Sequence, residues 1–494
     1  MVDKDLLSIQ EARALVRAAR KAQEEFRQCG QEKVDAVVAA VARAAAVQAE
    51  ALAALAVEET GFGKAADKAV KNRLASEKLL KAIKGMKTIG EINVDKEKRM
   101  TEIAVPVGVI AGIVPSTNPT STVIYKSIIA LKAGNAIVFT PHPSARRCIA
   151  KTVEIIQAAL HGCGVSTDLV SCVSVPTLEG SAELMKVADL ILATGGPGMV
   201  KAAYSSGTPA LGVGAGNVPA FIERSADIED AVAKVFASKT FDNGTICASE
   251  QSIVTESVIA ERVRAAMLAN GAYFLHGDDL EKVKRIMERG NGSMNPAIVG
   301  KDAQAIAALA GIRIPQGTRL LVSDEPGVGP RHPFSKEKLT ALLGFYVVED
   351  WREACELCIK LLENGGIGHS LAIHSLNEDV IREFGLKKPV SRMLVNTPST
   401  QGAVGISTSL FPSFTLGCGT VGGSSTSDNV TPMNLLNIRR VVHDLGAGVC
   451  SVPAHAAPVS PKPSGAFAPT PGVAADMDVE AITALIVEQL KKVI

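Results

Sequence analysis

The spacing of apolar residues changes several times along the chain. Between residues 8 and 90, apolar positions recur every three or four residues inside alanine-rich segments such as VDAVVAAVARAAAVQAEALAALAVEE, which predicts packed amphipathic helices. From residue 101 to about residue 223, apolar strand-like runs alternate with helical ones. Examples are EIAVPVGVIAGIVP, TVIYKSIIALKAG, NAIVFTP, LVSCVSVP, ELMKVADLILAT and PAFIE. This alternation predicts an α/β fold in which a parallel sheet carries helices on both faces.

A second α/β stretch follows from about residue 226 to residue 440, with strand candidates such as SEQSIVTE, RLLVSD, YVVED, SLAIHS and SRMLVNT. We therefore expect four parts. Residues 1–225 form N-terminal helices and a first α/β domain, and residues 226–445 form a second α/β domain. Residues 446–477 form a Pro/Ala-rich linker, and residues 478–494 form an amphipathic helix.

Proline content predicts the linker, and the spacing of apolar residues predicts the C-terminal helix. The linker carries a high density of proline, which prevents helices and central strands and favours an extended spacer. The final segment, DVEAITALIVEQLKKVI, places its apolar residues on one stripe, with acidic residues at its start and lysines at its end, as the helix dipole favours.

Composition narrows the classes of function. The 494 residues are 47% hydrophobic and 21% charged with a net charge of +1, so no global field points to nucleic acid or an anionic membrane as partner. The N-terminus lacks a signal-peptide core and no later run is long enough to span a membrane, so we expect a cytoplasmic location. Nine scattered cysteines do not suggest a disulfide framework. The pair Cys355 and Cys358 lies in a helical pattern with no second ligand pair, so we expect no metal site.

One cysteine stands in an unusual local setting. Cys247, in FDNGTICASEQ, follows a turn-forming string and precedes a predicted strand, which predicts an exposed loop at the lip of a sheet. A second segment, VPSTNPTST, places Asn118 between a strand and a helix. A side-chain amide held there can donate a hydrogen bond to the oxyanion that forms when a thiolate adds to a carbonyl. An inert cysteine and a simple Asn-Pro turn are the alternatives.

Together with other motifs, these segments resemble the aldehyde dehydrogenase superfamily, and specifically its coenzyme-A-acylating branch. The resemblance runs from about residue 10 to residue 445. It implies the aldehyde dehydrogenase fold, with a Rossmann-like dinucleotide-binding domain in residues 1–225 and a catalytic domain that carries the nucleophilic cysteine in residues 226–445. The motifs occur in the order that this branch has them: VPSTNPTS, KAGNAIVFTPHP, ATGGPGMV, GVGAGNVP, FDNGTICASEQS, SKEKL, MLVNTPSTQG and TLGCGTVGG.

The resemblance implies roles for individual residues. Cys247 would be the nucleophile, and Asn118 with the Cys247 backbone N–H would stabilise the oxyanion. Glu337 in SKEKL would face the nicotinamide ribose, the alternative being a helix-surface glutamate paired with Lys336 or Lys338. His369 in GIGHSLAIH would deprotonate the incoming thiol, or would simply be hydrogen-bonded at the start of a strand.

The resemblance also implies a cofactor site. Thr194, Gly195 and Gly196 would bind the pyrophosphate at a helix start, although their segment ATGGPG lacks the usual GxGxxG, and Pro141 would lie at the adenosine end. No acidic residue follows the FTPHP strand closely, whereas Arg146 and Arg147 do. A basic residue there accommodates a 2′-phosphate, so both NAD and NADP remain open.

A departure from the hydrolytic relatives indicates the reaction. Where those enzymes carry a water-activating glutamate, this chain has LGVGAGN, residues 211–217, with no carboxylate. The resemblance therefore implies that coenzyme A takes the acyl group from Cys247 and that a short-chain aldehyde is the substrate. A sulfoacetaldehyde-type enzyme using NADP, a hydrolytic aldehyde dehydrogenase and a non-catalytic cargo or scaffold protein are the alternatives.

The C-terminal tail resembles the encapsulation peptides of bacterial microcompartment cargo. This implies that residues 478–494 dock on a shell protein, the alternative being a helix that folds back on the enzyme or joins subunits. The family habit implies a homodimer or a homotetramer.

Overall fold

The computed structural model describes residues 3–290 and 293–445. The chain divides into two units, Met1–Val442 and His443–Ile494. The expected Pro/Ala-rich linker and the C-terminal amphipathic helix lie outside the described residues. All of the described helices and strands belong to the first unit.

The N-terminal segment folds into helices, as its apolar period predicts. Asp3 caps the first helix by accepting a hydrogen bond from the backbone N–H of Asp5 at 2.9 Å. Gly61 ends the third helix in the left-handed conformation, at φ 67°, which glycine adopts without strain. The helices are α1 (Lys4–Phe26), α2 (Gln31–Val47), α3 (Ala49–Thr60), α4 (Ala65–Arg73), the π-helical turn Leu74–Lys78 and α5 (Leu79–Ile83).

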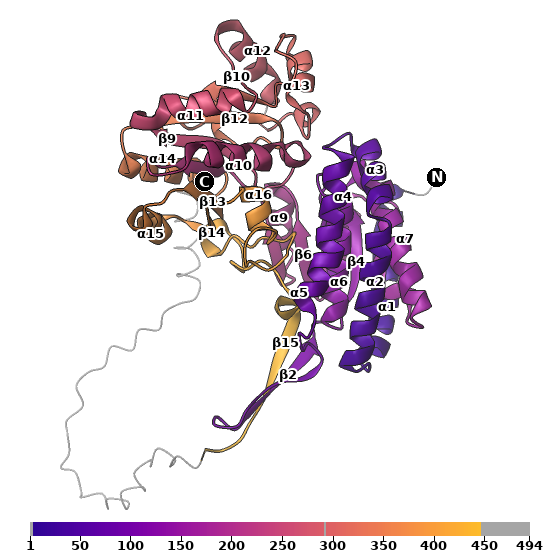
Figure 1. The fold of residues 1–494 in the computed structure, drawn as a ribbon. Helices are drawn as coiled ribbons and strands as arrows, with labels where there is room; N and C mark the ends of the chain where they lie inside the picture. The colour runs from indigo at the N-terminus through magenta and orange to yellow at the C-terminus, as the bar shows by residue number, and fades with distance from the viewer. Residues whose placement is uncertain (1–2, 291–292, 446–494) are drawn as a thin grey trace, which may run out of the picture. The chain divides into compact units, whose positions relative to one another are not determined.

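A five-stranded parallel sheet forms the first α/β part, in the order β5-β4-β3-β6-β7. Its central strands are buried on both faces, which explains why their sequences are continuous apolar runs. The strands are β3 (Val109–Val114), β4 (Ala136–Pro141), β5 (Val170–Cys172), β6 (Leu190–Thr194) and β7 (Ala210–Val213). The associated helices are α6 (Pro119–Lys132), α7 (Arg146–Gly162), α8 (Leu178–Val187) and α9 (Pro197–Tyr204). Figure 1 shows the indigo N-terminal helices beside this part. Helix α1 packs against α8, and α2 packs against α6 and α7.

A seven-stranded parallel sheet forms the second α/β part, in the order β10-β11-β12-β9-β8-β13-β14. Its strands are β8 (Val218–Ile222), β9 (Glu250–Glu256), β10 (Ala272–Phe274), β11 (Leu320–Asp324), β12 (Leu342–Val348), β13 (Gly368–His374) and β14 (Val390–Val395). The α-helices of this stretch are α10 (Ile228–Thr240), α11 (Ser257–Ala269), α12 (Gly277–Met287), α13 (Ala303–Ala310), α14 (Trp351–Glu363), α15 (Glu378–Lys387) and α16 (Ser399–Ala403). Strand β8 belongs to this sheet, so a division at residue 225 falls after its first strand.

A third, three-stranded antiparallel sheet is absent from the sequence-based expectation. It consists of β1 (Gly90–Asp95), β2 (Met100–Pro106) and β15 (Leu436–Val442) in the order β1-β2-β15. The run EIAVPVGVIAGIVP looks like one β-rich segment, but it breaks at Gly108, which has φ 123° and separates β2 from β3. Figure 1 shows yellow β15 beside β2, a pairing of segments more than 300 residues apart.

Among residues 3–290 and 293–445, no single helix is long and apolar enough to cross a membrane. Helices α2 and α3 are long and apolar enough only when they are taken together, and the chain bends by 61° between them.

Candidate active site

The candidate site lies where the carboxyl edge of the five-stranded sheet meets the amino edge of the seven-stranded sheet. Asn118 follows β3 and caps α6. Cys247 precedes β9, and His369 is the second residue of β13. The Asn118 Nδ2 donates to the carbonyl oxygen of Thr245 at 3.2 Å, two residues from the thiol. The structure therefore brings Asn118 beside the Cys247 loop, as the oxyanion interpretation requires.

The loop that carries Cys247 is firmly held. Its turn passes through the left-handed region at Asp242, Asn243 and Gly244, with φ 49°, 52° and 74°. Asp, Asn and Gly tolerate this conformation best, which explains the DNG string. The Asn243 Nδ2 donates to the Gly300 carbonyl oxygen at 2.9 Å. Cys247 itself is half-buried, so the expectation of an exposed, flexible thiol is wrong.

The thiol and an imidazole form a close pair. The Nε2 of His369 lies 3.2 Å from the Sγ of Cys247, and its Nδ1 lies 3.0 Å from the hydroxyl of Ser370. Burial raises the pKa of Cys247 to about 12, and the nearby Glu337 carboxylate adds to the rise. Burial lowers the pKa of His369 to about 3, with the Arg392 cation adding to the effect. Both groups are therefore neutral at pH 7 in this state.

A carboxylate enters the site from a distant part of the sequence. The Oε1 of Glu337 accepts the backbone N–H of Gly216 at 3.0 Å, and burial raises its pKa to about 7. Its neighbours point elsewhere: Lys336 pairs with Glu288 at 2.5 Å, and the Lys338 Nζ donates to the Lys336 carbonyl oxygen at 2.7 Å. Glu337 follows the short 3₁₀ turn Pro333–Ser335 and is not on a helix, so the surface-glutamate alternative is wrong.

The glycine-rich segment 211–217 is shaped by the thiol loop. A Cβ added to Gly216 would lie 2.1 Å from the carbonyl oxygen of Cys247 and 3.2 Å from the Cγ of His369. Only glycine fits such an approach. The segment itself carries no carboxylate, as the sequence shows, but the structure brings Glu337 to its backbone from outside.

The expected cofactor residues gather at the carboxyl edge of the five-stranded sheet. Thr194 is the last residue of β6, and Gly195 and Gly196 lead into α9, with Gly196 as its N-cap. Pro141 is the last residue of β4. No atom lies within 4 Å of a Cβ added to Gly196, so its backbone is open to a ligand. The helix start and the sheet edge suit a dinucleotide.

Acidic residues near the start of α7 come from helix α3. Arg146 is exposed at the start of α7. Glu59 accepts the backbone N–H groups of Arg147 and Cys148, each at 2.7 Å, and Glu58 pairs with the Arg147 guanidinium at 3.1 Å. The sequence next to the strand lacks an acid, but the fold supplies two. Acidic and basic side chains at the same place are compatible with either NAD or NADP.

Sequence reasoning missed two further groups near the thiol. Arg392 on β14 is buried and donates to the Gly417 carbonyl oxygen. Its positive charge lowers the pKa of Cys247, but burial raises that pKa by more. Cys418 is buried nearby and raises that pKa. Neither was predicted, because only the folded chain brings them close to the thiol. Cys355 and Cys358 are buried in α14, and residues 3–290 and 293–445 contain no group of three or more potential metal ligands.

The chain is similar in sequence to several known dehydrogenases. A family model described as the aldehyde dehydrogenase family matches residues 5–327. The chain is 45% identical over 441 residues to the bifunctional aldehyde-alcohol dehydrogenase AdhE of Escherichia coli, covering 88% of this chain and 49% of that protein. It is 37% identical over 428 residues to the succinate-semialdehyde dehydrogenase (acetylating) of Clostridium kluyveri, covering 86% of this chain and 94% of that one. The chain spans about half the length of the bifunctional relatives it matches.

Solved structures share the fold. An acetylating aldehyde dehydrogenase from Geobacillus thermoglucosidasius has a TM-score of 0.89 at 50% identity, covering 90% of this chain and 99% of that one. A propionaldehyde dehydrogenase from the fucose-utilisation microcompartment of Clostridium phytofermentans has a TM-score of 0.79 at 29% identity, covering 87% and 96%. A propionaldehyde dehydrogenase from Rhodopseudomonas palustris with bound propionyl-CoA has a TM-score of 0.80 at 29% identity, covering 87% and 94%.

Proposed function

The chain belongs to the aldehyde dehydrogenase family, and from that premise we propose that it is a coenzyme-A-acylating aldehyde dehydrogenase. It oxidises a short-chain aldehyde with NAD(P)⁺ and coenzyme A to acyl-CoA, NAD(P)H and a proton, and the reaction is reversible. The observation that carries the proposal is the pairing of the Cys247 thiol with His369 beside the Asn118 amide.

The first half of the reaction is addition of sulfur to the aldehyde. The Cys247 thiol gives up its proton and its sulfur bonds to the carbonyl carbon, producing a thiohemiacetal. We assign His369 as the proton acceptor, because its Nε2 lies 3.2 Å from the sulfur. The Asn118 amide and the Cys247 backbone N–H donate to the oxygen that becomes negative. When bound, NAD(P)⁺ supplies the hydride acceptor, and loss of hydride from the thiohemiacetal leaves a thioester on Cys247.

The second half is transfer of the acyl group between two sulfurs. The coenzyme A thiol loses a proton and attacks the thioester carbon, which releases acyl-CoA and restores Cys247. Once His369 has released the first proton to solvent, it is placed to take this one and to return it to the departing Cys247 sulfur. Segment 211–217 contains no carboxylate or imidazole that could activate water, and the close approach of Gly216 to the Cys247 carbonyl oxygen leaves no room for a side chain there. We assign Glu337 to cofactor binding at the nicotinamide ribose, and its hydrogen bond to the Gly216 N–H holds it in place.

The cofactor residues fit a dinucleotide. We propose that Thr194, Gly195 and Gly196 bind the pyrophosphate at the start of α9, and that Pro141 and Arg146 lie at the adenosine end. The open backbone at Gly196 and the position of all five at one sheet edge support this assignment.

The test is a direct assay. Purified protein is given acetaldehyde, propionaldehyde or butyraldehyde with coenzyme A and either NAD⁺ or NADP⁺, and reduced nicotinamide is measured together with acyl-CoA. Cys247→Ser is the inactive control, and Cys358→Ala, which changes a thiol buried in α14, is the matched active one. Absence of coenzyme-A-dependent reduction with every aldehyde contradicts the proposal.

We further propose that the enzyme is microcompartment cargo and that residues 478–494 bind a shell protein. The support is the apolar stripe in that segment and a structural relative that comes from a microcompartment. Deletion of residues 447–494 should leave turnover intact and abolish co-localisation with shell proteins. A truncated protein that unfolds assigns the segment to the enzyme body instead.

We also propose a homodimer or a homotetramer, from the habit of the family. Sedimentation velocity of the full chain at micromolar concentration gives the mass. A monomer at those concentrations contradicts this proposal and leaves the chemical one standing.

A further inference from the structure

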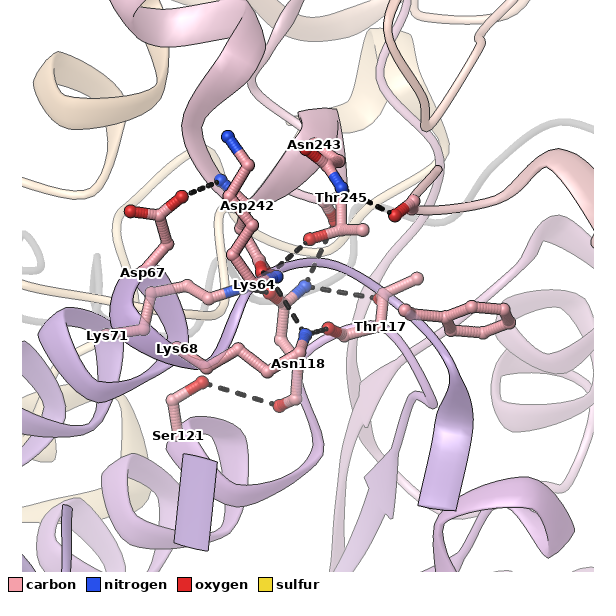
Figure 2. Close-up of polar contacts among 12 residues, drawn as sticks. Lys64, Asp67, Lys68, Lys71, Thr117, Asn118, Ser121, Asp242, Asn243 and Thr245 are labelled. Atoms are coloured by element: carbon pink, nitrogen blue, oxygen red, sulfur yellow. Dashed lines mark hydrogen bonds and ion pairs between the residues drawn. The ribbon is translucent and has the colours of Figure 1, made fainter. Parts of the chain in front are cut away.

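A buried ionic cluster lies directly behind the oxyanion amide. Asp242 is fully buried, and Lys68 and Lys71 of α4 are only 2% and 1% exposed. The Lys68 Nζ lies 2.9 Å from the Asp242 Oδ2, and the Lys71 Nζ contacts the same oxygen. Figure 2 shows these side chains converging on Asn118 and Thr245. Burying such charges is costly unless they are paired, so a cluster beside a reaction centre calls for an explanation.

The two lysines contact different atoms on the far side of the cluster. Lys71 donates to the side-chain Oδ1 of Asn118. Lys68 donates to the backbone carbonyl oxygen of Thr117 at 2.8 Å. Only Lys71 therefore reaches the functional amide itself.

The contact fixes which end of the amide faces the thiol loop. An ammonium group can only donate, so it must face the oxygen of the Asn118 amide. The Nδ2 is then turned to the Thr245 carbonyl oxygen at 3.2 Å and the Thr117 hydroxyl at 3.1 Å. A cation on the amide oxygen also polarises the amide and strengthens its N–H donors.

Asp242 connects this contact to the loop that carries the thiol. The Thr245 hydroxyl donates to the Asp242 Oδ2 at 2.6 Å, and the Lys64 backbone N–H donates to the Oδ1 at 2.7 Å. The backbone N–H of Asp242 donates to Asp67 at 2.7 Å. One carboxylate thus fixes the start of α4, the Asn118 turn and the Cys247 loop relative to one another.

The charge on Lys71 is maintained by its neighbours. Burial lowers its pKa to about 8, Asp242 and Asp67 oppose this effect, and the positive charge of Lys68 adds to it. These are the charged groups that face it from α4 and from the thiol loop. Lys71 is therefore mainly protonated at pH 7 and donates to Asn118 under ordinary assay conditions.

We propose that Lys71 is the positioning residue of the oxyanion site: its ammonium, held by Asp242, orients and polarises the Asn118 amide toward the carbonyl oxygen that Cys247 attacks. Lys71 touches no reacting atom and acts through Asn118. The inference rests on the proposed acyl-transfer function, because it needs an oxyanion to form at this place.

The test compares two lysines that pair with the same carboxylate. Lys71→Met should lower kcat by about tenfold or more with the KM for aldehyde and coenzyme A changed less than about threefold, because the lost interaction acts in the transition state. Lys68→Met removes an equivalent charge from Asp242 and should lower the Tm by a similar amount, with a loss of kcat below about threefold. Lys71→Arg, which keeps a cation there, should recover part of the rate.

Two further readouts separate positioning from general damage. Alkylation of Cys247 by iodoacetamide forms no oxyanion, so its rate should be the same in Lys71→Met and the unchanged enzyme within about twofold. In a double-mutant cycle, Lys71→Met should add almost nothing to Asn118→Ala, since Lys71 acts only through that amide.

Three results overturn the inference: equal losses of kcat in the two lysine variants, an alkylation rate that falls with kcat, or additive effects in the cycle. If Lys71→Met does not fold, Lys71→Gln is measured in its place with the same expectation, and a kcat equal to that of the unchanged enzyme overturns the inference. Failure of the unchanged enzyme to form acyl-CoA instead refutes the proposed function, so the two failures are distinguishable.

Discussion

The Nε2 of His369 lies 3.2 Å from the Sγ of Cys247, and both groups are neutral in this state. These two residues lie 122 positions apart in the sequence. Within residues 3–290 and 293–445, theirs is the one thiol–imidazole contact at the site. Burial prevents a thiolate–imidazolium pair at rest, since it penalises both charged forms. In the proposed mechanism the thiol therefore loses its proton as the aldehyde binds, and the 3.2 Å contact places His369 to accept it.

The pH dependence of Cys247 alkylation tests this neutral state. Burial and the Glu337 charge disfavour the thiolate and raise the pKa of Cys247 to about 12, so the thiolate fraction grows as pH rises. The rate of iodoacetamide reaction at Cys247 should rise about tenfold per pH unit between pH 6 and pH 9, with no plateau. Mass spectrometry of the peptide that contains Cys247 measures the rate. A plateau below pH 8 refutes the neutral pair.

Replacement of His369 tests the proton acceptor. His369→Gln should lower kcat roughly 100-fold or more, in the range of general-base losses. His374→Gln is the matched control, because His374 is a second buried histidine at the other end of β13. Its kcat should stay within about twofold even where its Tm falls. Equal kcat values for both variants would remove His369 from the mechanism.

Glu337 should affect the cofactor and the thiol, and not the identity of the product. At pH 8 its carboxylate is mostly charged, because its pKa is raised to about 7 and lies below that pH. Glu337→Gln should raise the KM for the nicotinamide cofactor about tenfold, equivalent to about 1.4 kcal/mol. It should also speed alkylation of Cys247, since a charge that raises the pKa of the thiol is gone. Initial rates over a cofactor series measure the first effect. Loss of a free-acid product on this substitution would instead identify Glu337 as a hydrolytic base.

The close approach of Gly216 to the thiol loop gives a steric prediction. A Cβ at Gly216 would lie 2.1 Å from the Cys247 carbonyl oxygen, whereas nothing lies within 4 Å of a Cβ at Gly214. Gly216→Ala should therefore displace the loop, lower the free energy of unfolding by about 1 to 3 kcal/mol and reduce kcat strongly. Gly214→Ala should change neither appreciably. Thermal unfolding and steady-state assays check both, and a harmless Gly216→Ala would show that the loop yields freely.

The sequence predicts much of the fold and part of the site. The pattern of apolar residues, together with the Gly and Pro residues between the segments, predicts the parallel strands of both main sheets, because a buried parallel strand is a continuous apolar run. They do not predict β15 beside β2, because such pairing depends on contacts between distant segments. The same reason explains the site: Cys247 and Asn118 stand out locally by their turn residues, whereas Lys71 and Glu59 have ordinary helical neighbours. Only the fold brings those two to the thiol and cofactor regions.

The residues around Cys247 led to one wrong prediction from the sequence, the exposure of the loop. Turn-forming residues around Cys247 predict an exposed loop, because such residues are commonest at the surface. Here Asp242 and Asn243 instead use their side chains to bind buried partners, Lys68 and the Gly300 carbonyl oxygen. Polar turn residues can thus organise a buried loop when the fold supplies partners for them.

The central claim is that the acyl group on Cys247 passes to a thiol and not to water. The most direct measurement gives the enzyme carbon-13-labelled acetaldehyde or propionaldehyde and NAD(P)⁺, with and without coenzyme A, and follows the labelled products by NMR. We expect labelled acyl-CoA in proportion to reduced nicotinamide when coenzyme A is present, and only slow turnover without it. Labelled carboxylic acid, released at the full rate without coenzyme A, would contradict the account.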